Sequence, residues 1–174
     1  MDTARHWAND IYDVFKCQHI SLVSYVPDAG HVPLLKLLQG DPSIRLVSLT
    51  TEEEGVALAA GAYLGGVRSA LLMQSSGVGN IPNMCSLLRT CGIPFLTLIT
   101  MRGEYGEFNP WQVPMGQATP KVLEAMGFIV HRVEYPDEVG EVVHGAARLA
   151  FNSYASVAVL LSQRLIGAKK FAGK

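Results

Sequence analysis

Residues 49–63 read Leu49-Thr50-Thr51-Glu52-Glu53-Glu54-Gly55-Val56-Ala57-Leu58-Ala59-Ala60-Gly61-Ala62-Tyr63, and this stretch decides the fold. It passes directly from an apolar strand pattern into a helix pattern built from small residues. Three consecutive carboxylates, at positions 52–54, therefore fall in the first turn of that helix. In an open α/β sheet the ligand crevice lies at the carboxyl ends of the strands. The stretch predicts an α/β fold with acidic side chains at its ligand-binding edge.

Strand and helix patterns alternate along the rest of the chain. Short apolar runs predict buried strands over residues 20–26, 45–50, 69–74, 94–100, 128–133 and 156–161. Helices are expected over residues 3–17, 31–38, 52–64, 79–90, 119–126 and 136–151. Continuous apolarity is typical of parallel strands that helices cover on both faces. We therefore expect one three-layer α/β/α domain over residues 1–174, with a six-stranded, mostly parallel sheet.

One long connection, residues 102–118, interrupts this alternation. Its glycines and prolines are too closely spaced for a regular helix: Gly103, Gly106, Pro110, Pro114 and Gly116. Loops of this length are usually functional or disordered. Disordered segments are poor in aromatic side chains, whereas this one carries Tyr105, Phe108 and Trp111. We predict an ordered loop that covers a functional site.

The composition excludes several classes of protein. A formal net charge of -1 over 174 residues gives no basic surface for nucleic acid, and the only basic cluster is Lys169, Lys170 and Lys174. The 3 cysteines form no C-x-x-C pair, and the histidines lack metal-ligand spacing, so we expect neither disulfides nor a metal site. No apolar run reaches the ~18 residues that a membrane span needs. We expect a soluble, cytoplasmic protein that binds neither nucleic acid nor membranes.

The three acids at positions 52–54 also have a structural interpretation. Thr51 is placed to cap the helix, and Glu54, three residues later, completes a capping box. Acidic side chains in a first helical turn also suit the helix dipole. This interpretation accounts for Glu54 and Glu53 better than for Glu52. Because Glu52 immediately follows the strand, we expect it to point over the carboxyl edge of the sheet.

A glycine- and serine-rich turn follows the third predicted strand and reads Gln74-Ser75-Ser76-Gly77-Val78-Gly79-Asn80. Turns of this kind aim backbone N–H groups at anions. The turn lacks both the G-x-G-x-x-G spacing of dinucleotide-binding folds and the lysine of a P-loop. Two interpretations stay open, a ligand-binding turn and a structural turn in which Asn80 caps the next helix.

Other polar residues at the same predicted edge have two interpretations each. Arg102 either binds a carboxylate or sulfonate-like anion or pairs with Glu104 or Glu107 at the surface. Asp28 either faces a ligand or caps the following helix. His31 is either a site residue or a structural histidine.

Taken together, these segments resemble the pyrimidine-binding (PYR) domain of thiamine diphosphate-dependent decarboxylases over nearly the whole chain. The greatest likeness is to the α subunit of sulfopyruvate decarboxylase and to the N-terminal half of phosphonopyruvate decarboxylase. The likeness rests on Val26-Pro27-Asp28, Glu52-Glu53-Glu54-Gly55, Ala59-Ala60-Gly61-Ala62-Tyr63, Leu72 to Asn80, Arg102-Gly103, Gln112 and Pro114-Met115-Gly116. It implies a flavodoxin-like PYR domain.

The resemblance also implies roles for particular residues. In that family a glutamate nine residues before the glycine of the small-residue helix hydrogen-bonds N1′ of the cofactor's aminopyrimidine. Counting nine residues back from Gly61 leads to Glu52, which the resemblance therefore selects as the catalytic acid. Further cofactor contacts are implied for Gln74, Ser75, Ser76, Gly77, Gly79 and Asn80. Substrate contacts are implied for Asp28, His31, Arg102 and Gln112.

The reaction that the resemblance implies is the decarboxylation of 3-sulfopyruvate to sulfoacetaldehyde and carbon dioxide, a step of coenzyme M biosynthesis. Members of that decarboxylase family hold Mg²⁺ and the diphosphate with a Gly-Asp-Gly segment and a following asparagine on a separate diphosphate-binding (PP) domain. This chain lacks that segment, and Gly40-Asp41-Pro42 is a poor substitute. The resemblance therefore implies a β subunit that holds Mg²⁺ and shares the thiamine diphosphate, in an α/β hetero-oligomer with α–α contacts.

Alternatives to this function stay open. The substrate is a small anionic 2-oxo acid, and phosphonopyruvate is one alternative to sulfopyruvate. Trp111 stands where the relatives often carry alanine in a Pro-Ala-Gln step, which bears on the size of the substrate pocket. A non-catalytic binding or regulatory module on the same fold is a second alternative. A third is a carbon–carbon bond-forming enzyme like acetolactate synthase, although such enzymes usually carry both domains on one long chain.

Overall fold

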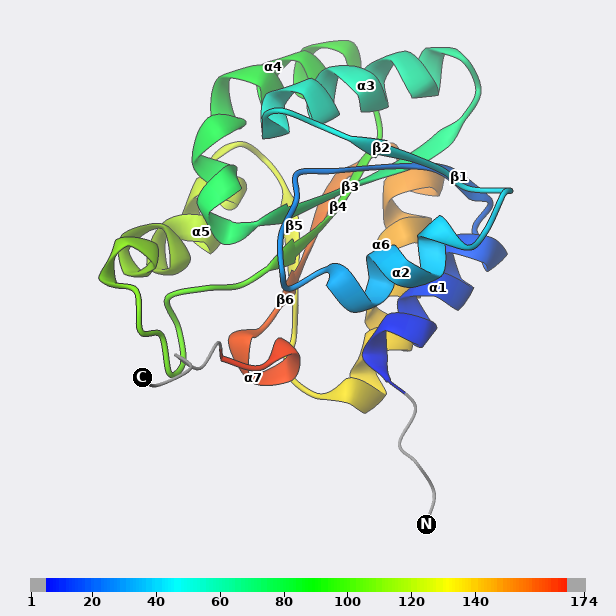
Figure 1. Ribbon diagram of the computed structural model, residues 1–174. Helices are drawn as coiled ribbons and strands as arrows, with labels where there is room; N and C mark the ends of the chain where they lie inside the picture. Colours follow the sequence, from blue (N-terminus) through cyan, green and yellow to red (C-terminus); the bar gives the residue numbers. More distant parts are fainter. Residues whose placement is uncertain (1–5, 169–174) are drawn as a thin grey trace.

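The computed structural model describes residues 6–168, which form a six-stranded sheet with helices on both faces (Figure 1). The start of the first predicted helix, at Thr3, and the basic cluster Lys169, Lys170 and Lys174 lie outside the described residues. The strands are Ile20–Tyr25 (β1), Arg45–Ser48 (β2), Arg68–Gln74 (β3), Phe95–Thr100 (β4), Ile129–Val133 (β5) and Ser156–Leu161 (β6). Every pairing is parallel, and the predicted fold class is confirmed.

The helices follow the predicted alternation with strands. They are Trp7–Cys17 (α1), Val32–Gln39 (α2), Glu52–Leu64 (α3), Pro82–Cys91 (α4), Val113–Ala125 (α5), Val139–Ser153 (α6) and Gln163–Ile166 (α7). Three 3-10 turns, Ser75–Asn80 (η1), Pro110–Gln112 (η2) and Pro136–Glu138 (η3), precede helices α4, α5 and α6. The sequence did not predict the short helix α7.

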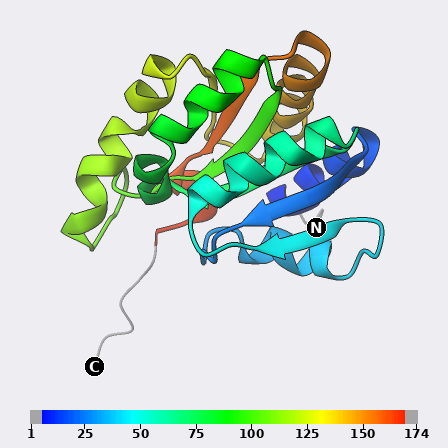
Figure 2. The same cartoon turned by 90° about the horizontal axis from the view of Figure 1, so that it is seen from above.

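The two faces of the sheet carry separate apolar layers. Alternate residues of a strand point to opposite faces, so Ala70 and Leu72 of β3 pack toward α1, α2 and α6. Leu71 and Met73 of the same strand pack toward α3, α4 and α5. Figure 1 and the view from above in Figure 2 show the two helical layers on either side of the sheet. This double coverage explains why the strand sequences are continuously apolar.

The strand order places a topological switch point at β1 and β3. The order across the sheet is β2-β1-β3-β4-β6-β5, so the chain leaves β1 toward β2 and returns on the other side to form β3. Ligands of open parallel sheets bind outside the carboxyl ends of the strands at such a switch point. Segments that follow β1, β2, β3 and β4 therefore meet along one edge.

The predicted start of helix α5 is wrong, because the helix begins at Val113 instead of Thr119. Pro114 stands in the first turn, where a missing N–H costs no helical hydrogen bond. Gly116 lacks the Cβ atom that would overlap the Arg102 carbonyl oxygen and stand 2.9 Å from its carbon. Pro120 lies inside the helix without ending it. The glycines and prolines that suggested a loop therefore allow a close approach of the helix to the chain after β4.

Candidate active site

Glu52 lies at the carboxyl edge of the sheet, where the chain turns from β2 into helix α3. It is the first residue of α3 and is 8% exposed. The preceding Thr51 has an extended backbone, so the helix begins abruptly at the acid. Asn80, the last residue of turn η1, donates a hydrogen bond from Nδ2 to Glu52 Oε2 at 2.7 Å. This carboxylate is therefore buried and held on one side by an amide.

The space beside the Glu52 carboxylate exists because residue 77 is glycine. A Cβ atom on Gly77 would stand 2.6 Å from Glu52 Cγ and would overlap Oε1. Real Cβ atoms essentially never approach another atom so closely. The glycine of turn η1 and the glutamate of α3 are therefore in direct contact, and the glutamate side chain fits there only beside a glycine.

The other two acids of the triplet have a different environment. Glu53 and Glu54 are both exposed. Glu54 Oε2 accepts a hydrogen bond from the Thr50 backbone N–H at 2.8 Å, whereas the Thr51 side chain makes no capping bond. The predicted capping box is therefore wrong, because the glutamate reaches past Thr51 to the preceding residue.

Asn80 does not cap helix α4, contrary to the structural interpretation of the glycine- and serine-rich turn. Turn η1 continues to Asn80, the N-cap residue of α4 is Ile81, and the helix begins at Pro82 rather than Gly79. The asparagine side chain bonds to Glu52 instead.

Asp28 follows β1 and lies at the switch point. Its Oδ1 accepts a hydrogen bond from Gln74 Nε2 at 2.8 Å, and its Oδ2 accepts one from the Thr100 hydroxyl. Burial raises the pKa of Asp28, but the adjacent His31 ring and the hydrogen bonds from Thr100 and the Gly30 backbone outweigh burial and hold the pKa well below its usual range. Asp28 is therefore ionised. It does not cap α2, whose N-cap residue is His31.

His31 is enclosed beside Asp28. It is 1% exposed, and its Nδ1 lies 3.6 Å from Asp28 Oδ2. Within the described residues neither ring nitrogen has a hydrogen-bond partner. Buried polar atoms are almost always satisfied, so this pair of unsatisfied ring nitrogens is unusual.

The serines of turn η1 point in different directions. The Ser76 hydroxyl donates to Gln74 Oε1 at 2.9 Å, which extends the chain of bonds from Thr100 through Asp28 and Gln74. Ser75 is fully buried, and its hydroxyl accepts a hydrogen bond from the Arg102 backbone N–H at 3.1 Å. Ser75 therefore joins the turn to the chain after β4 instead of facing the crevice.

Arg102 is paired with Glu107, and the pair is buried rather than at the surface. Nε and Nη2 of Arg102 each donate to the Glu107 carboxylate at 2.6 Å. The two side chains are 8% and 4% exposed. The bonds from Arg102 hold the pKa of Glu107 well below its usual range, although burial acts in the opposite direction. The charge of Arg102 is therefore already balanced within the chain.

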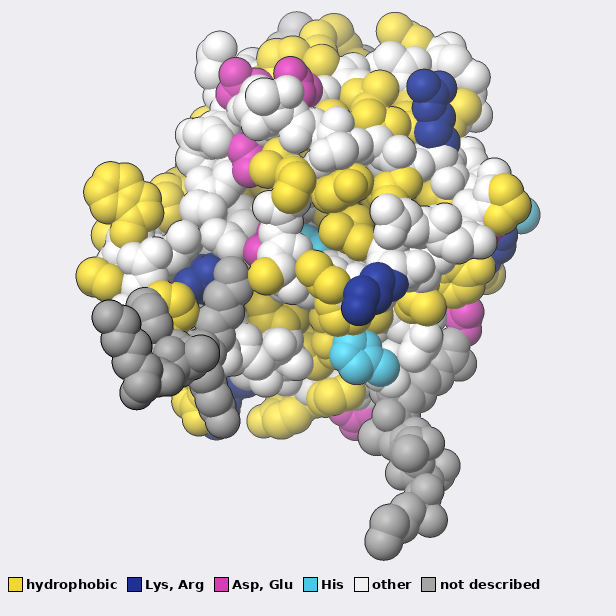
Figure 3. Space-filling model, viewed as in Figure 1, with side chains coloured by type: hydrophobic (Ala, Val, Ile, Leu, Met, Phe, Trp, Pro, Cys, Tyr) yellow, Lys and Arg dark blue, Asp and Glu magenta, His cyan; other side chains and the backbone are white. Residues whose placement is uncertain are grey.

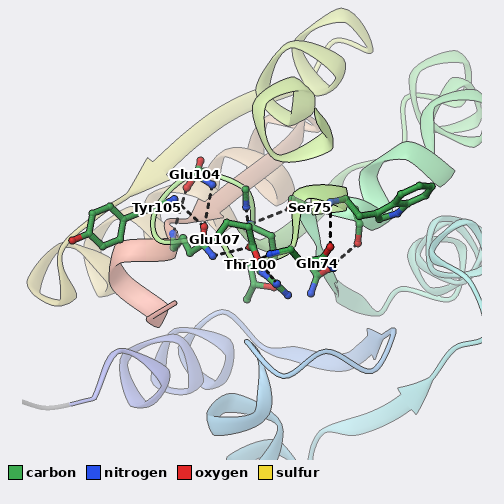
Figure 4. Close-up of polar contacts among 12 residues, drawn as sticks. Gln74, Ser75, Thr100, Glu104, Tyr105 and Glu107 are labelled. Carbon is green, nitrogen blue, oxygen red and sulfur yellow. Dashed lines mark hydrogen bonds and ion pairs between the residues drawn. The ribbon is translucent and has the colours of Figure 1, made fainter. Parts of the chain in front are cut away.

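Gln163, the first residue of α7, fixes the segment after β4 from the other side. Its Oε1 accepts hydrogen bonds from the backbone N–H groups of Glu104 and Tyr105, each at 3.0 Å, and its Nε2 donates to Glu107 at 2.9 Å. Figure 4 shows this cluster beside Gln74, Ser75 and Thr100, with the Tyr105 ring pointing away from it. Glu104 pairs with Arg132. The segment after β4 is therefore held by a satisfied polar network.

A cavity of about 220 Å³ opens at the same edge. Its walls include Asp28, Gly30, Thr100, Arg102 and residues 166–168. Gln112 lies near this segment, because a Cβ atom on Gly103 would stand 2.9 Å from the Gln112 carbonyl carbon. The Gln112 Oε1 atom is buried without a hydrogen-bond partner in the part of the chain that the structure describes.

The structure thus brings together most of the residues expected from sequence. Glu52, Gly77 and Asn80 form one group, and Asp28, His31, Gln74 and Ser76 form a second. Gly79 is exposed beside Met115, with a built Cβ at 3.6 Å from Sδ. Thr100 and Gln163 were missed. Thr100 ends a strand at the predicted edge, whereas nothing local to Gln163 signals its role.

Residues 6–168 contain no cluster of histidine, cysteine or carboxylate side chains suited to a metal ion. Asp41, from the segment compared with Gly-Asp-Gly, precedes β2 at the opposite edge of the sheet and accepts bonds from Tyr12 and Lys16 at 2.9 Å and 2.6 Å. On the face shown in Figure 3, lysine and arginine side chains are scattered among apolar and uncharged ones. The helices of the described chain are not long and apolar enough to cross a membrane.

The fold and this edge define an α/β domain with a buried carboxylate at the carboxyl edge of its parallel sheet. No family model matches the chain. Among solved structures, its fold is similar to a part of 2-oxoglutarate:ferredoxin oxidoreductase from Magnetococcus marinus, with a TM-score of 0.72 and 16% identity over 93% of this chain and 29% of that chain. This likeness concerns the fold alone.

Curated relatives show the family. The chain is 38% identical over 152 residues to sulfopyruvate decarboxylase subunit alpha of Methanococcus maripaludis, covering 87% of this chain and 91% of the relative. It is 36% identical to the subunit of the same name from Methanocaldococcus jannaschii, over 86% of this chain and 89% of the relative. The chain belongs to the family of sulfopyruvate decarboxylase α subunits. It is also 37% identical over 107 residues to phosphonopyruvate decarboxylase of Streptomyces viridochromogenes, covering 60% of this chain and 27% of that protein.

Proposed function

We propose that this chain is the pyrimidine-binding half of a thiamine diphosphate-dependent decarboxylase that converts 3-sulfopyruvate to sulfoacetaldehyde and carbon dioxide. The names of its full-length relatives support the reaction and the α/β assembly. The observation that carries the proposal is the buried carboxylate of Glu52 at the crevice edge, held by Asn80 and enclosed by Gly77.

The residues at this edge fit the aminopyrimidine ring of thiamine diphosphate. A ring nitrogen that carries a proton needs a carboxylate acceptor in a site with little water, and Glu52 is such an acceptor at 8% exposure. Gly77 projects no side chain, which lets the Glu52 carboxylate lie directly against turn η1. Gln74, Ser76, Gly79 and the turn backbone complete the surface proposed to contact the cofactor.

Glu52 has a defined task in this proposal. Its carboxylate would hold the aminopyrimidine ring and would give or take a proton there, a role that general acid–base catalysis assigns to a carboxylate within hydrogen-bond reach. The chemistry that thiamine diphosphate supplies when bound is an electron sink for the carbon that loses carbon dioxide. Burial of Glu52 keeps bulk water from competing for that proton.

The second polar group at the edge supports a role in holding the substrate. His31 offers a buried, unsatisfied N–H group to a carboxylate or sulfonate oxygen. Asp28 is ionised and keeps His31 and Gln74 in place. Arg102 lines the cavity but is neutralised by Glu107, so it contributes shape and a remaining N–H group more than free positive charge. Gln112 offers a buried carbonyl oxygen on the same side.

A partner subunit completes the proposed site. The described residues offer no group of side chains for Mg²⁺, so the proposal assigns the metal and the diphosphate to a β subunit with a PP domain. The α subunit name of the relatives supports such an assembly. An α/β hetero-oligomer with α–α contacts follows from this assignment.

The test is reconstitution. The purified chain alone should bind thiamine diphosphate weakly by calorimetry and show no aldehyde production from sulfopyruvate, and addition of the β subunit should restore both. The same assay with phosphonopyruvate and pyruvate ranks the substrates, and preference for phosphonopyruvate would favour the alternative that the Streptomyces relative suggests. Turnover by the chain alone would contradict the proposed division of labour.

The carboxylate is tested in the reconstituted complex. Glu52→Gln should lower turnover by at least ~10²–10⁴-fold, with an unchanged far-ultraviolet circular dichroism spectrum. Glu53→Gln, which removes the exposed neighbour, is the matched control and should retain activity. Near-normal turnover by Glu52→Gln would favour a non-catalytic binding module.

A further inference from the structure

We propose that Asn80 is the positioning residue for Glu52, holding Oε2 and leaving Oε1 to exchange a proton with a bound ring. The inference rests on the function proposed above and assigns Asn80 a role other than cofactor contact or helix capping. Its basis is the 2.7 Å bond from Asn80 Nδ2 to Glu52 Oε2. Within residues 6–168, no donor bonds to Oε1, which lies against Gly77. The two oxygens of the carboxylate therefore have different surroundings.

Asn80 has no competing structural task that would explain its side chain. Helix α4 takes Ile81 as its N-cap residue and begins at Pro82, which has no N–H to be capped. The Asn80 residue is exposed, yet its amide turns inward to the buried Glu52. An exposed amide is satisfied by water at no cost, so the inward bond serves the carboxylate rather than the turn.

An asparagine amide suits this task because its NH₂ group only donates and a carboxylate only accepts. The bond therefore fixes the side-chain rotamer of Glu52 from one side. Gly77 fixes the carboxylate from the other side, because the two groups share the space where a Cβ would stand. Both constraints come from turn η1, so this turn places the acid of helix α3.

Few titratable groups surround Glu52, so a change in its titration in an Asn80 variant can be assigned to position 80. On its own helix the neighbouring charges are Glu53 and Glu54, both exposed. Turn η1 carries no titratable side chain. The other elements packed most closely against α3 carry no carboxylate or histidine, and their titratable side chains are Tyr25, Arg68, Cys85, Arg89 and Cys91. The elements that pack most closely against α3 therefore carry no acid that would compete with a carboxylate introduced at position 80.

The first measurement follows the Glu52 carboxyl carbon by NMR in the full chain labelled with ¹³C-glutamate, with the resonance assigned by its loss in Glu52→Gln. Asn80→Asp should raise the titration midpoint of Glu52 by at least about one pH unit, because a like charge replaces a donor. Asn83→Asp adds the same charge on the exposed first turn of α4 and should shift the midpoint by less than about a third of that amount. Equal shifts in the two variants would overturn the proposal.

The second measurement uses the complex reconstituted with the β subunit. The acid limb of the kcat profile should move to higher pH in Asn80→Asp and stay in place in Asn83→Asp. Asn80→Ala, which removes the donor without adding charge, should lower kcat about threefold to tenfold at neutral pH with little change in the KM for substrate. If Glu52→Gln inactivates the complex but the Asn80 variants have the same kcat and pH profile as Asn83→Asp, the positioning role is refuted and the proposed function is not. An active Glu52→Gln complex would instead refute the proposed function, while the NMR midpoints still report on the Asn80–Glu52 bond.

Discussion

Glu52 and Gly77 occupy adjoining space so tightly that a Cβ atom on the glycine would stand 2.6 Å from Glu52 Cγ. The pairing joins the start of helix α3 to turn η1, although Gly77 follows Glu52 by 25 residues in the chain. A change in the turn is therefore expected to move the acid.

Gly77→Ala should displace the Glu52 carboxylate while leaving the fold intact. A misplacement of about 1 Å can lower turnover by about 100-fold, and the overlap should also lower the free energy of unfolding by about 1–3 kcal/mol. The measurements are kcat in the reconstituted complex and urea unfolding. Gly145→Ala in α6, where a built Cβ meets nothing within 4 Å, is the control. Wild-type turnover in Gly77→Ala would contradict the shared placement of the two residues.

Removing the partner of the buried Arg102 should destabilise the chain. Glu107→Gln leaves the guanidinium uncompensated and should lower the free energy of unfolding at pH 7 by about 3 kcal/mol. Glu134→Gln, which breaks an ion pair in which both side chains are 37% exposed, should cost less than about 1 kcal/mol. Equal effects in urea unfolding would show that burial of the Arg102 pair has no energetic consequence.

The same pair predicts a pH dependence. The pKa of Glu107 is lower in the folded chain than in the unfolded chain, so its contribution is fully present above the unfolded value of about 4.3 and is lost as pH falls below it. The stability difference between wild type and Glu107→Gln should therefore be constant from pH 5 to 7, to within the ~0.5 kcal/mol typical of such comparisons, and shrink toward pH 3. A difference that does not change below about pH 4 would rule out this linkage.

Gln163 should control the exchange of two backbone amides in a distant segment. Gln163→Ala removes the acceptor of the Glu104 and Tyr105 N–H groups, and loss of one hydrogen bond corresponds to about tenfold faster hydrogen exchange there. Gln163→Glu keeps an acceptor for these N–H groups but places a second carboxylate beside Glu107. Protection of the two amides should therefore return as pH is lowered and the new carboxylate becomes protonated. Unchanged exchange in Gln163→Ala would mean that other contacts hold the segment.

The three cysteines should differ in reactivity. Burial raises the pKa of the Cys85 thiol to about 12, whereas Cys17 and Cys91 are exposed. Because the thiolate is the reactive form, a thiol reagent at pH 8 should modify two cysteines of the native chain quickly and the third only after unfolding. Rapid modification of all three would show that the layer under α4 opens readily.

The fold could be predicted from sequence where the signal was local. Continuous apolar runs specified the strands, and the passage from Leu49 into Glu52 placed α3 correctly. The start of α5 was missed, because Pro114 and Gly116 break helices in most contexts but here suit a first turn and a close approach to Arg102. The insertion of β6 between β4 and β5 depends on non-local pairing, which no short pattern reports.

The site was predictable to the extent that its residues follow strands. Asp28, Glu52 and Gln74 all stand at strand ends and reach the same edge. Their partners were harder to find, because a hydrogen bond from Asn80 to Glu52 or from Gln163 to Glu107 depends on packing between distant segments. The interpretation of Asn80 as a cap failed for the same reason, since turn η1 extends further than the sequence indicates.

The network around Gln163 has a consequence for assembly. A segment that must become ordered on association costs conformational entropy and weakens the complex. Residues 102–109 are already fixed in the single chain by backbone N–H groups that donate hydrogen bonds to Gln163 and Glu107. If the proposed β subunit docks at this rim, it meets a preorganised shape, and docking is closer to lock-and-key recognition than to coupled folding.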